Sequence, residues 1–440
     1  MEDHLVESKT TPQLPLKIII IGLVAGAAFN FFSYRLTRAI GVDFYHFWAV
    51  DVVLKLDHQA GSPYQKHAAR YAHILKKYAQ LSQDEALKLV NRYRRNPEFT
   101  ASPLLYSLFS FFPGNYSTAF LLFQIILILL FISSLFWLQN LYHPINFVFI
   151  CFASMLFLHF TPFAHDLLAG NINSLQFFCL TMAIVLASNQ QKLKQTARVA
   201  ALTGVLVFSA LLKPNLAIIV FALLAYSWKI GGRRFFLKSI VFSLLWTFLF
   251  IGLGCFYFHD LGIWWKWLAF LRDQDTLIRP VRYANYASPI VLHHFTGLGI
   301  RNSTIFILLI FLVPTVLVLG KKISHWQCVL KSIIGNLHLV SAIAITFTAA
   351  IAPLMWSHYY LILIIPCLWI VNRQDNRYLN VLGAMALLLC SGAFDQYFKI
   401  IGWEKIFIPI ANSCSWLPIW FATLLDIRKI SKENRQKLIN

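Results

Sequence analysis

The chain has little charge of any kind and especially few acidic residues. Its 440 residues include 18 Asp and Glu against 38 Lys and Arg, and charged residues make up 13% of the chain while hydrophobic residues make up 58%. With a mean hydropathy of +0.63, this composition excludes an ordinary soluble protein. The net charge of +20 does not indicate nucleic-acid binding, because Lys and Arg lie between apolar segments and form no single basic face. They indicate membrane topology and contact with anionic lipid.

Paired cysteines and the usual signatures of soluble enzymes are also missing. The seven cysteines include no CxxC pair and no repeated spacing, which indicates small apolar fillers in place of a disulfide framework or metal ligands. The chain contains no GxxxxGK[ST], GxGxxG, HExxH or GxSxG motif. We therefore expect neither nucleotide-driven chemistry nor a bound metal or cofactor.

Long hydrophobic runs are abundant. A spanning helix needs about 20 mostly apolar residues, and about twelve segments approximate this length. A shorter stretch, 101–112, has Pro103 near one end and is followed by Pro113, and it predicts a re-entrant half-helix. The sequence thus predicts an all-α polytopic membrane helix bundle of about 12 spans plus one half-helix, forming a single domain over residues 1–440. The spans are expected near residues 16–34, 117–138, 144–161, 173–188, 199–212, 214–229, 239–258, 302–320, 337–353, 359–371, 379–394 and 406–425.

Basic residues predict which side of the membrane each loop faces, because cytoplasmic loops are rich in Lys and Arg. If the basic clusters are cytoplasmic, the first long loop, 35–100, faces outward together with the turns near Asn171, Lys213 and Trp356. Residues 68–93 of that loop carry an apolar stripe among basic residues, which predicts helical structure at the headgroup level. We therefore expect a multi-pass protein of the cell (inner) membrane with its site on the outer or periplasmic face. The clusters are Lys192, Lys194 and Arg198; Lys229, Arg233, Arg234 and Lys238; Lys321 and Lys322; Arg373 and Arg377; and the tail from Arg428 to Lys437.

Asp43 lies just beyond the first predicted span, in the run Gly41-Val42-Asp43-Phe44-Tyr45. An acid at the membrane surface is a candidate functional residue, and Asp is equally a favoured helix N-cap. A helix that begins near Asp43 brings Asp51 to the same face about two turns along. The two interpretations are compatible, since a cap would also keep the carboxylate ionised.

Two further polar motifs are expected on the same side. Lys213 precedes Pro214, and either a snorkelling lysine or a phosphate ligand fits this position. Asn171 and Asn173 form a polar turn before an apolar span. That turn is either a plain helix cap or a group of donors for a phosphate or a sugar hydroxyl.

Aromatic residues surround the remaining candidates. His358 lies between Trp356 and Tyr359, where it is either structural or able to pair with phosphate or move a proton. Tryptophans at 264, 265 and 267 surround Lys266 and indicate an interfacial aromatic belt, with sugar stacking as the alternative.

In order and spacing these motifs resemble the integral-membrane glycosyltransferases of the GT-C fold class. They are most similar to glycosyltransferase family 87, the polyprenyl-phosphate-mannose-dependent mannosyltransferases. The family's acidic and aromatic run after the first span is matched by Asp43-Phe44-Tyr45, and its Gly-x-x-Tyr turn by Gly61-Ser62-Pro63-Tyr64. Its Gly-Gln-x-Asn turn, Lys-Pro pair and Ser-Trp-x-His-Tyr motif resemble Gly170-Asn171-Ile172-Asn173, Lys213-Pro214 and Met355-Trp356-Ser357-His358-Tyr359. The chain departs from the pattern at Asn171 for Gln, at Met355 for Ser, and at Ala101, where an aromatic residue is expected.

The resemblance implies transfer of a sugar, with mannose expected, from a polyprenyl-phosphate donor to a glycolipid or glycan acceptor on the outer face of the bilayer, with inversion. It makes Asp43 the general base, which takes the proton of the attacking hydroxyl. Lys213 and His358 would stabilise the departing phosphate, with Asn171 as a neutral donor. The lipid-linked sugar is then a co-substrate, and no metal is required. The other substrate-binding residues implied are Tyr45, Tyr64, Trp356 and Tyr359.

Two other classes compete with the enzyme. A transporter or flippase of a lipid-linked sugar also has many spans, a half-helix and polar residues at helix breaks. Two features argue against a transporter. The polar groups are expected at one face of the membrane, and the sequence has no internal repeat. A scaffold subunit with a decayed site would explain Ala101 and the missing Ser.

Overall fold

The structure is a computed structural model that describes residues 33, 39–58, 60–64, 68–94, 99–142, 161–188, 195–272, 281, 285–319, 323–352, 354–373, 377–392 and 395–439. These residues are helical wherever they have regular structure, and their one strand-like feature is an isolated bridge between Asn285 and Trp356. The predicted all-α class is therefore confirmed.

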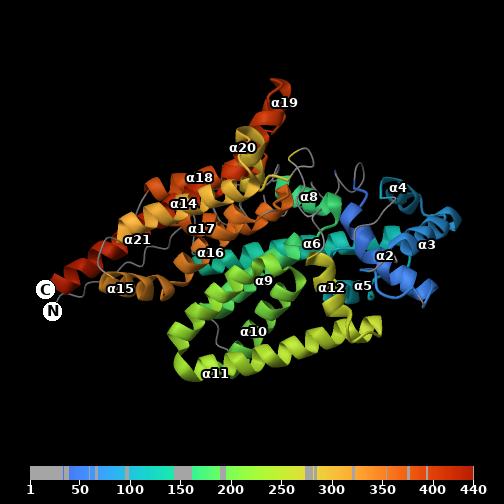
Figure 1. Ribbon diagram of the computed structural model, residues 1–440, viewed down its shortest axis with the longest axis horizontal. Coiled ribbons are helices and arrows are strands. Elements are labelled where there is room, and N and C mark those ends of the chain that lie inside the picture. The colour runs from blue at the N-terminus through green and yellow to red at the C-terminus, as the bar shows by residue number, and fades with distance from the viewer. Residues whose placement is uncertain are drawn as a thin grey trace, which may run out of the picture.

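The helices form an elongated bundle in which α6, α9, α10 and α11 pack in sequence and α16 joins α11 to α21 (Figure 1). The described residues form one large hydrophobic core and a second, smaller cluster. The elements are α2 (Val42–Leu56), α3 (Ala68–Leu81), α4 (Glu85–Tyr93), α5 (Pro103–Phe109), α6 (Tyr116–Tyr142), α8 (Thr161–Ala169), α9 (Asn173–Ala187), α10 (Gln195–Leu212), η1 (Pro214–Leu216), α11 (Ala217–Phe258), α12 (Ile263–Arg272), α13 (Ser288–Thr296), α14 (Ile300–Leu319), α15 (Ile323–Ile334), α16 (Leu337–Ile351), η4 (Ser357–Leu363), α17 (Ile364–Val371), α18 (Arg377–Ser391), α19 (Asp395–Ile400), α20 (Glu404–Cys414) and α21 (Trp416–Ile439).

Several helical segments have the length and apolar composition of a membrane crossing, as expected for a multi-pass membrane protein. Five such segments are Tyr116–Tyr142, Gln195–Leu212, Pro214–Phe258, Ile300–Leu319 and Glu404–Asn434. The helices Trp326–Ile334 and Leu337–Ile351 meet at 96° and together make a sixth candidate. Shorter apolar helices are Asn173–Ala187, Ser357–Val371 and Tyr378–Ser391.

These segments coincide with most of the predicted spans. The predicted spans 16–34 and 144–161 lie almost wholly outside the described residues. The count of about twelve crossings stays a prediction, because several of the observed helices are too short to cross a bilayer of ordinary thickness unaided.

α11 contains two of the predicted spans, 214–229 and 239–258, in its two arms. The arms meet at Gly232, whose φ of 67° and ψ of −169° interrupt the helix. Glycine adopts this conformation without a side-chain clash. Figure 1 shows the second arm turning back along the bundle. Large apolar side chains such as Phe221 and Phe248 are exposed along both arms, as expected for a surface that faces lipid.

The first long loop is structured, as its sequence predicts. The apolar stripe of residues 68–93 forms two helices, α3 and α4, because the Asp84 carboxylate accepts a hydrogen bond of 3.1 Å from Leu87 N and begins a new helix. The expected half-helix in 101–112 is α5, which begins after Ser102. Figure 1 places α2 to α5 at one end of the bundle, and α15, the bend of α11 and the last turns of α21 toward the other.

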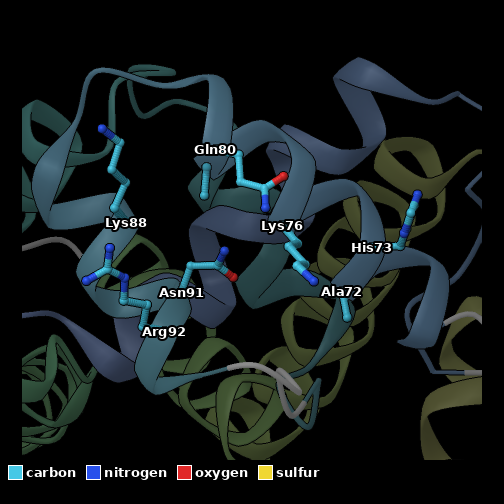
Figure 2. Close-up of a pocket in the computed structure, with 8 residues that line it drawn as sticks. Ala72, His73, Lys76, Gln80, Lys88, Asn91 and Arg92 are labelled. Carbon is cyan, nitrogen blue, oxygen red and sulfur yellow. The ribbon is translucent and has the colours of Figure 1, made fainter.

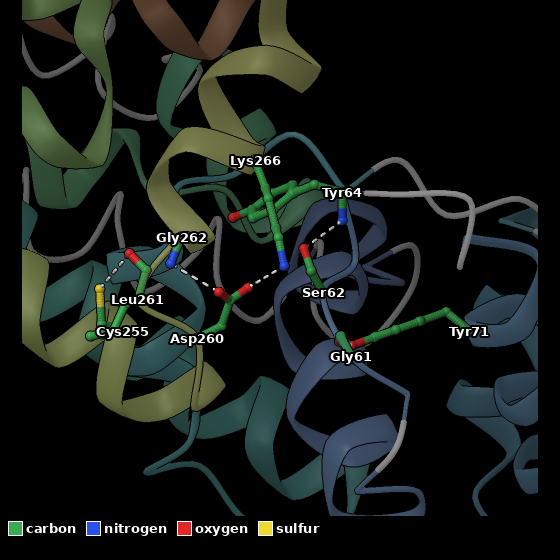
Figure 3. A network of polar contacts seen from close by, with 9 residues as sticks. All are labelled: Gly61, Ser62, Tyr64, Tyr71, Cys255, Asp260, Leu261, Gly262 and Lys266. Atoms are coloured by element: carbon green, nitrogen blue, oxygen red, sulfur yellow. Dashed lines mark hydrogen bonds and ion pairs between the residues drawn. The ribbon is translucent and has the colours of Figure 1, made fainter.

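The turn between α2 and α3 is held by polar contacts (Figure 3). The Tyr71 hydroxyl donates to the Gly61 carbonyl at 2.8 Å, and Tyr64 N donates to Ser62 Oγ at 3.3 Å. The Tyr64 hydroxyl in turn donates to the Ala101 carbonyl at 2.7 Å. These bonds fasten the turn against the segment that leads into α5.

Candidate functional site

Asp43 lies in the first turn of α2, but it is not the N-cap that its sequence position suggested. Gly41 is the N-cap residue, in a left-handed conformation with φ 64°. A Cβ at this glycine would lie 2.7 Å from the Tyr116 hydroxyl oxygen, so the close approach also requires glycine. The helix therefore begins at Val42, and Asp43 places its carboxylate near the positive end of the helix dipole.

The buried Asp43 carboxylate is held by two residues from other parts of the chain. Asn171 Nδ2 donates to Asp43 Oδ2 at 2.6 Å, and Arg94 Nη2 lies 3.6 Å from Asp43 Oδ1. Asn171 belongs to the turn between α8 and α9, and Arg94 is the C-cap residue of α4. The amide and the guanidinium both favour the ionised carboxylate.

Lys213 brings a second charge to the same place. Its ammonium donates to Asn173 Oδ1 at 3.0 Å and to Asn171 Oδ1 at 3.4 Å, and lies 4.1 Å from the ring centre of Tyr359. Partial burial lowers the pKa of Lys213 to about 8, while the carboxylates of Asp166 and Asp43 oppose that shift. Asn171 thus contacts the cation with its oxygen and the carboxylate with its nitrogen.

Asp166 fixes the turn that carries both asparagines. Its carboxylate accepts hydrogen bonds from Asn173 N at 3.2 Å, Asn173 Nδ2 at 2.9 Å, Ser174 N at 2.9 Å and Ser174 Oγ at 2.6 Å. Burial raises the pKa of Asp166 to about 6, although these hydrogen bonds and the Lys213 charge act in the opposite direction. The sequence argument missed this residue. A rare acid inside an apolar stretch was the signal that could have found it.

Gly170 lets this turn reach α2. Its φ is 68°, and a Cβ there would lie 2.5 Å from Phe44 Cβ and 2.9 Å from Phe120 Cε2. A direct backbone bond of 3.2 Å from Gly41 N to the Leu168 carbonyl joins the two segments. The close contact of α8 with α2 therefore brings Asn171 to Asp43.

The Asp43, Asn171 and Lys213 side chains meet at one cavity of about 340 Å³. The expected site residues on its wall are Asp43, Asn171, Lys213, Trp356 and Tyr359. Trp267, for which sugar stacking was the alternative to an aromatic belt, also lines the cavity. Residues that the sequence argument did not select complete the wall, chief among them His46, Arg94 and Thr100. Arg94 is the most consequential of these, because it adds a second cation beside Asp43.

His46 lines the cavity as a neutral side chain. Burial, together with the nearby Arg94 charge, lowers the pKa of His46 to about 3. The imidazole therefore offers a hydrogen-bonding surface without adding positive charge at neutral pH.

Two buried nitrogens beside the cavity lack hydrogen-bond partners within the described residues, namely Trp356 Nε1 and His358 Nε2. Trp356 lines the cavity, whereas His358 lies behind its wall in contact with the rings of Trp356 and Tyr359. His165 Nδ1 and Ser357 Oγ share a hydrogen bond in the same region, and burial lowers the pKa of His165 to about 4. A buried donor without a partner is costly, so a ligand that accepts from Trp356 would relieve that cost.

Three expected site residues do not line the cavity: His358, described above, and Tyr45 and Tyr64. The Tyr45 hydroxyl donates to Asn91 Oδ1 at 3.1 Å. The Tyr64 hydroxyl donates to the carbonyl of Ala101, a residue that does line the cavity, and the Tyr64 ring packs against Tyr106, Phe258 and Phe270. Asp51 lies farther along α2, where it pairs with Lys55 at 2.6 Å and accepts from the Tyr257 hydroxyl at 3.3 Å. The alignment of Asp43 with Asp51 along the helix therefore does not make a pair of acids in one site.

The tryptophans near Lys266 separate into different roles. Trp267 lines the cavity and donates to the Thr100 carbonyl at 3.1 Å, whereas Trp265 is 76% exposed. Lys266 pairs with Asp260 at 2.7 Å at the start of α12 (Figure 3). Trp267 is thus the member of the group that could stack on a sugar, and the exposed Trp265 fits an aromatic belt.

Within the described ranges, no three His, Cys, Asp or Glu side chains gather in a way that would hold a metal ion. The sequence does contain one DxD pair, Asp273 and Asp275 in the segment Asp273-Gln274-Asp275. Paired aspartates of this kind are ligands that a metal ion can use, so the motifs missing from the sequence do not by themselves exclude a metal site. Both aspartates fall outside the described residues.

Comparisons of the chain with models of protein families, with curated proteins and with solved structures found no match in any of the three. The case for a function accordingly rests on the cavity and its residues.

Proposed function

We propose that the chain is a membrane glycosyltransferase with about twelve crossings. It transfers a sugar, with mannose expected, from a polyprenyl-phosphate donor to a glycolipid or glycan acceptor on the outer face of the membrane. The observation that carries the proposal is the arrangement of Asp43, Asn171 and Lys213 on one cavity wall. A carboxylate that can accept a proton faces the same 340 Å³ space as an ammonium that can hold a phosphate.

The geometry supports a single displacement. The acceptor hydroxyl attacks C1 of the sugar and gives its proton to Asp43 as the bond from C1 to the phosphate oxygen breaks. Polyprenyl phosphate leaves with the electron pair of that bond, and the configuration at C1 is inverted. A phosphate departs as a stable anion, so no second acid has to protonate it.

The neighbours of Asp43 suit these roles. Asn171 donates to the carboxylate at 2.6 Å and so orients it, while Lys213 lies over the Tyr359 ring with its charge toward the cavity. Lys213 and the unpartnered Trp356 Nε1 are placed to hold the phosphate oxygens. Trp267 offers an aromatic face to the sugar.

The distribution of basic residues supports an outer location for the cavity. Arg233 and Arg234 follow the bend of α11 at Gly232, and Arg428 and Lys429 begin the second half of α21. These elements lie toward the end of the bundle opposite α2 to α5 (Figure 1). Under the positive-inside rule, the end that holds the cavity then faces outward.

The proposal is tested with the purified full-length protein, radiolabelled polyprenyl-phosphate mannose and a total membrane-lipid extract as the source of acceptor. We expect label to move to a new product, and Asp43→Asn to lower the rate by about 100-fold or more, the usual contribution of a general base. Asp51→Asn is the matched control, since it removes a buried acid of the same helix that lies off the cavity. Full transfer by Asp43→Asn would contradict the base assignment, and vectorial movement of the donor without transfer would identify a flippase instead.

A further inference from the structure

A second recess, separate from the cavity at Asp43, lies between α3 and α4. It measures about 850 Å³, is open to the surface, and is lined by Ala72, His73, Lys76, Ala79, Gln80, Lys88, Asn91 and Arg92 (Figure 2). We refer to it as the α3–α4 groove. The lining residues of α3 and of α4 recur at intervals of three or four, so each helix presents one face to the groove.

The groove is positively charged. Lys76, Lys88 and Arg92 contribute ammonium and guanidinium groups, and none of the described lining residues is acidic. Lys76 and Arg92 make no ion pair with any residue that the structure describes, whereas Lys88 pairs with Glu85 at 2.7 Å. Glu85 is 82% exposed, so this pair is a weak, solvent-screened one.

Amide groups lie among these cations. In Figure 2, Asn91 and Gln80 appear between the side chains of Lys88 and Arg92 on one side and that of Lys76 on the other. Amide and cationic donors together suit the oxygens of a phosphate group, which accepts several hydrogen bonds at once. Small side chains at Ala72 and Ala79 leave room for such a group.

Exposed apolar side chains on the same two helices indicate what carries the phosphate. Leu81 is 78% exposed, Leu89 42% and Tyr93 69%. Amphipathic helices that combine basic residues with exposed Leu and aromatic side chains lie in the membrane interface. These side chains favour a bilayer lipid as the molecule that brings its phosphate to the groove, because its acyl chains can pack against them.

We propose that the α3–α4 groove binds the phosphate of an anionic membrane lipid and so fastens α3 and α4 to the bilayer surface. The bound lipid is distinct from the donor and the acceptor, and the proposal does not depend on sugar transfer. The groove nevertheless adjoins the site through α4. Asn91, on the wall of the groove, accepts a hydrogen bond from the Tyr45 hydroxyl. Arg94, at the end of the same helix, lies beside Asp43.

The test measures binding of a fluorescent phosphatidylglycerol to the full-length protein in neutral detergent, with fluorescent phosphatidylcholine as the uncharged comparison. We expect wild type to prefer phosphatidylglycerol, with an affinity that falls at high salt. Lys76→Gln/Arg92→Gln should weaken that binding by about tenfold or more, since it removes two cations that make charge-assisted hydrogen bonds to the phosphate. Asp43→Asn should bind the lipid like wild type, which separates this result from any failure of the proposed transfer.

The charge-matched control is Lys77→Gln/Arg301→Gln, which removes one exposed Lys and one exposed Arg outside the groove. Equal binding by this control and by Lys76→Gln/Arg92→Gln would overturn the proposal, as would equal affinity for the two lipids. Inorganic phosphate is the final competitor. If it displaced the lipid at comparable concentration, the groove would be a site for free phosphate, and the assignment to a lipid would be wrong.

Discussion

The Asp43 carboxylate lies 2.6 Å from the side-chain nitrogen of Asn171, a residue 128 positions later in the chain. The oxygen of the same amide accepts from Ile172 N at 2.7 Å and from Lys213 at 3.4 Å. These two donors fix the amide so that its nitrogen must face Asp43. Asn171 therefore orients the carboxylate and couples it to the cation across the cavity wall.

Replacing the amide with a second acid should block the proposed base. In Asn171→Asp two carboxylates would lie at hydrogen-bond distance, and one of them would hold a proton because two adjacent negative charges repel. We expect sugar transfer to fall by about 10-fold or more at neutral pH. Asn171→Gln is the conservative variant, since it keeps the amide donor, and it should retain more activity. Transfer rates measured across pH check this, and an Asn171→Asp protein as active as wild type would refute the role of the amide.

Binding of a phosphate by Lys213 should be lost in mildly alkaline solution. Its pKa is lowered to about 8, so the ammonium is charged at neutral pH and is lost as the pH rises through that value. Lys213→Arg should bind the donor less well at neutral pH, because the guanidinium has another shape, but should keep its affinity above pH 8. Donor affinity measured against pH tests this, and parallel profiles for the two proteins would count against it.

The same pKa has a consequence for stability. The folded pKa of Lys213 lies below the ordinary value of 10.5, so between about 8 and 10.5 the unfolded chain binds more protons. The contribution of Lys213 to the free energy of unfolding should therefore increase as the pH rises through this window. Comparison with Lys213→Met, which does not titrate there, isolates the effect in thermal unfolding.

Asp166 should matter for stability as well as for the site. Asp166→Ala would leave the backbone N–H groups of Asn173 and Ser174 without their buried acceptor, at a cost on the order of 3 kcal/mol. Asp166→Asn retains one acceptor oxygen and should be less damaging. The midpoint of thermal unfolding in detergent measures both variants. A midpoint for Asp166→Ala equal to that of wild type would show that the turn does not depend on this carboxylate.

Gly170→Ala should separate steric crowding from backbone strain. An added Cβ would lie 2.5 Å from Phe44 Cβ, and the φ of 68° adds the usual left-handed cost of about 1–2 kcal/mol. Gly297 is the matched control, because its φ is 74° but a Cβ there would meet no atom within 4 Å. Gly170→Ala should consequently lower the unfolding midpoint more than Gly297→Ala. Equal effects would mean that α2 can move away from the turn without loss.

Much of the architecture could be predicted from local sequence. Apolar length and composition predict helices and membrane crossings because each span satisfies its own backbone hydrogen bonds. The apolar stripe of residues 68–93 likewise predicted helical structure in the first long loop. Its division into α3 and α4 was not foreseen, since it depends on one local event, the capping of α4 by Asp84. The bend at Gly232 likewise depends on the conformation of a single residue.

The candidate site was predictable only in part. Asp43, Asn171 and Lys213 stood out because polar residues are rare in apolar surroundings, and all three line the same cavity. Tyr45 and Tyr64 were selected by resemblance, yet neither lines the cavity, and their hydroxyls donate to Asn91 Oδ1 and to the Ala101 carbonyl. No sequence pattern states which way a side chain on a packed helix will point once its neighbours are in place.

The sequence by itself determined an all-α membrane protein and the small set of polar residues available for chemistry, because composition and helical periodicity are properties of short segments. The tertiary structure alone decided which of those residues meet. Gly41 and Gly170 allow α2 and the turn before α9 to touch, and this contact brings Asn171 to Asp43. Arg94 enters the site because folding brings the end of α4 to Asp43. Asp166 acts more locally, since its carboxylate holds the turn of Asn173 and Ser174, which that contact places beside α2.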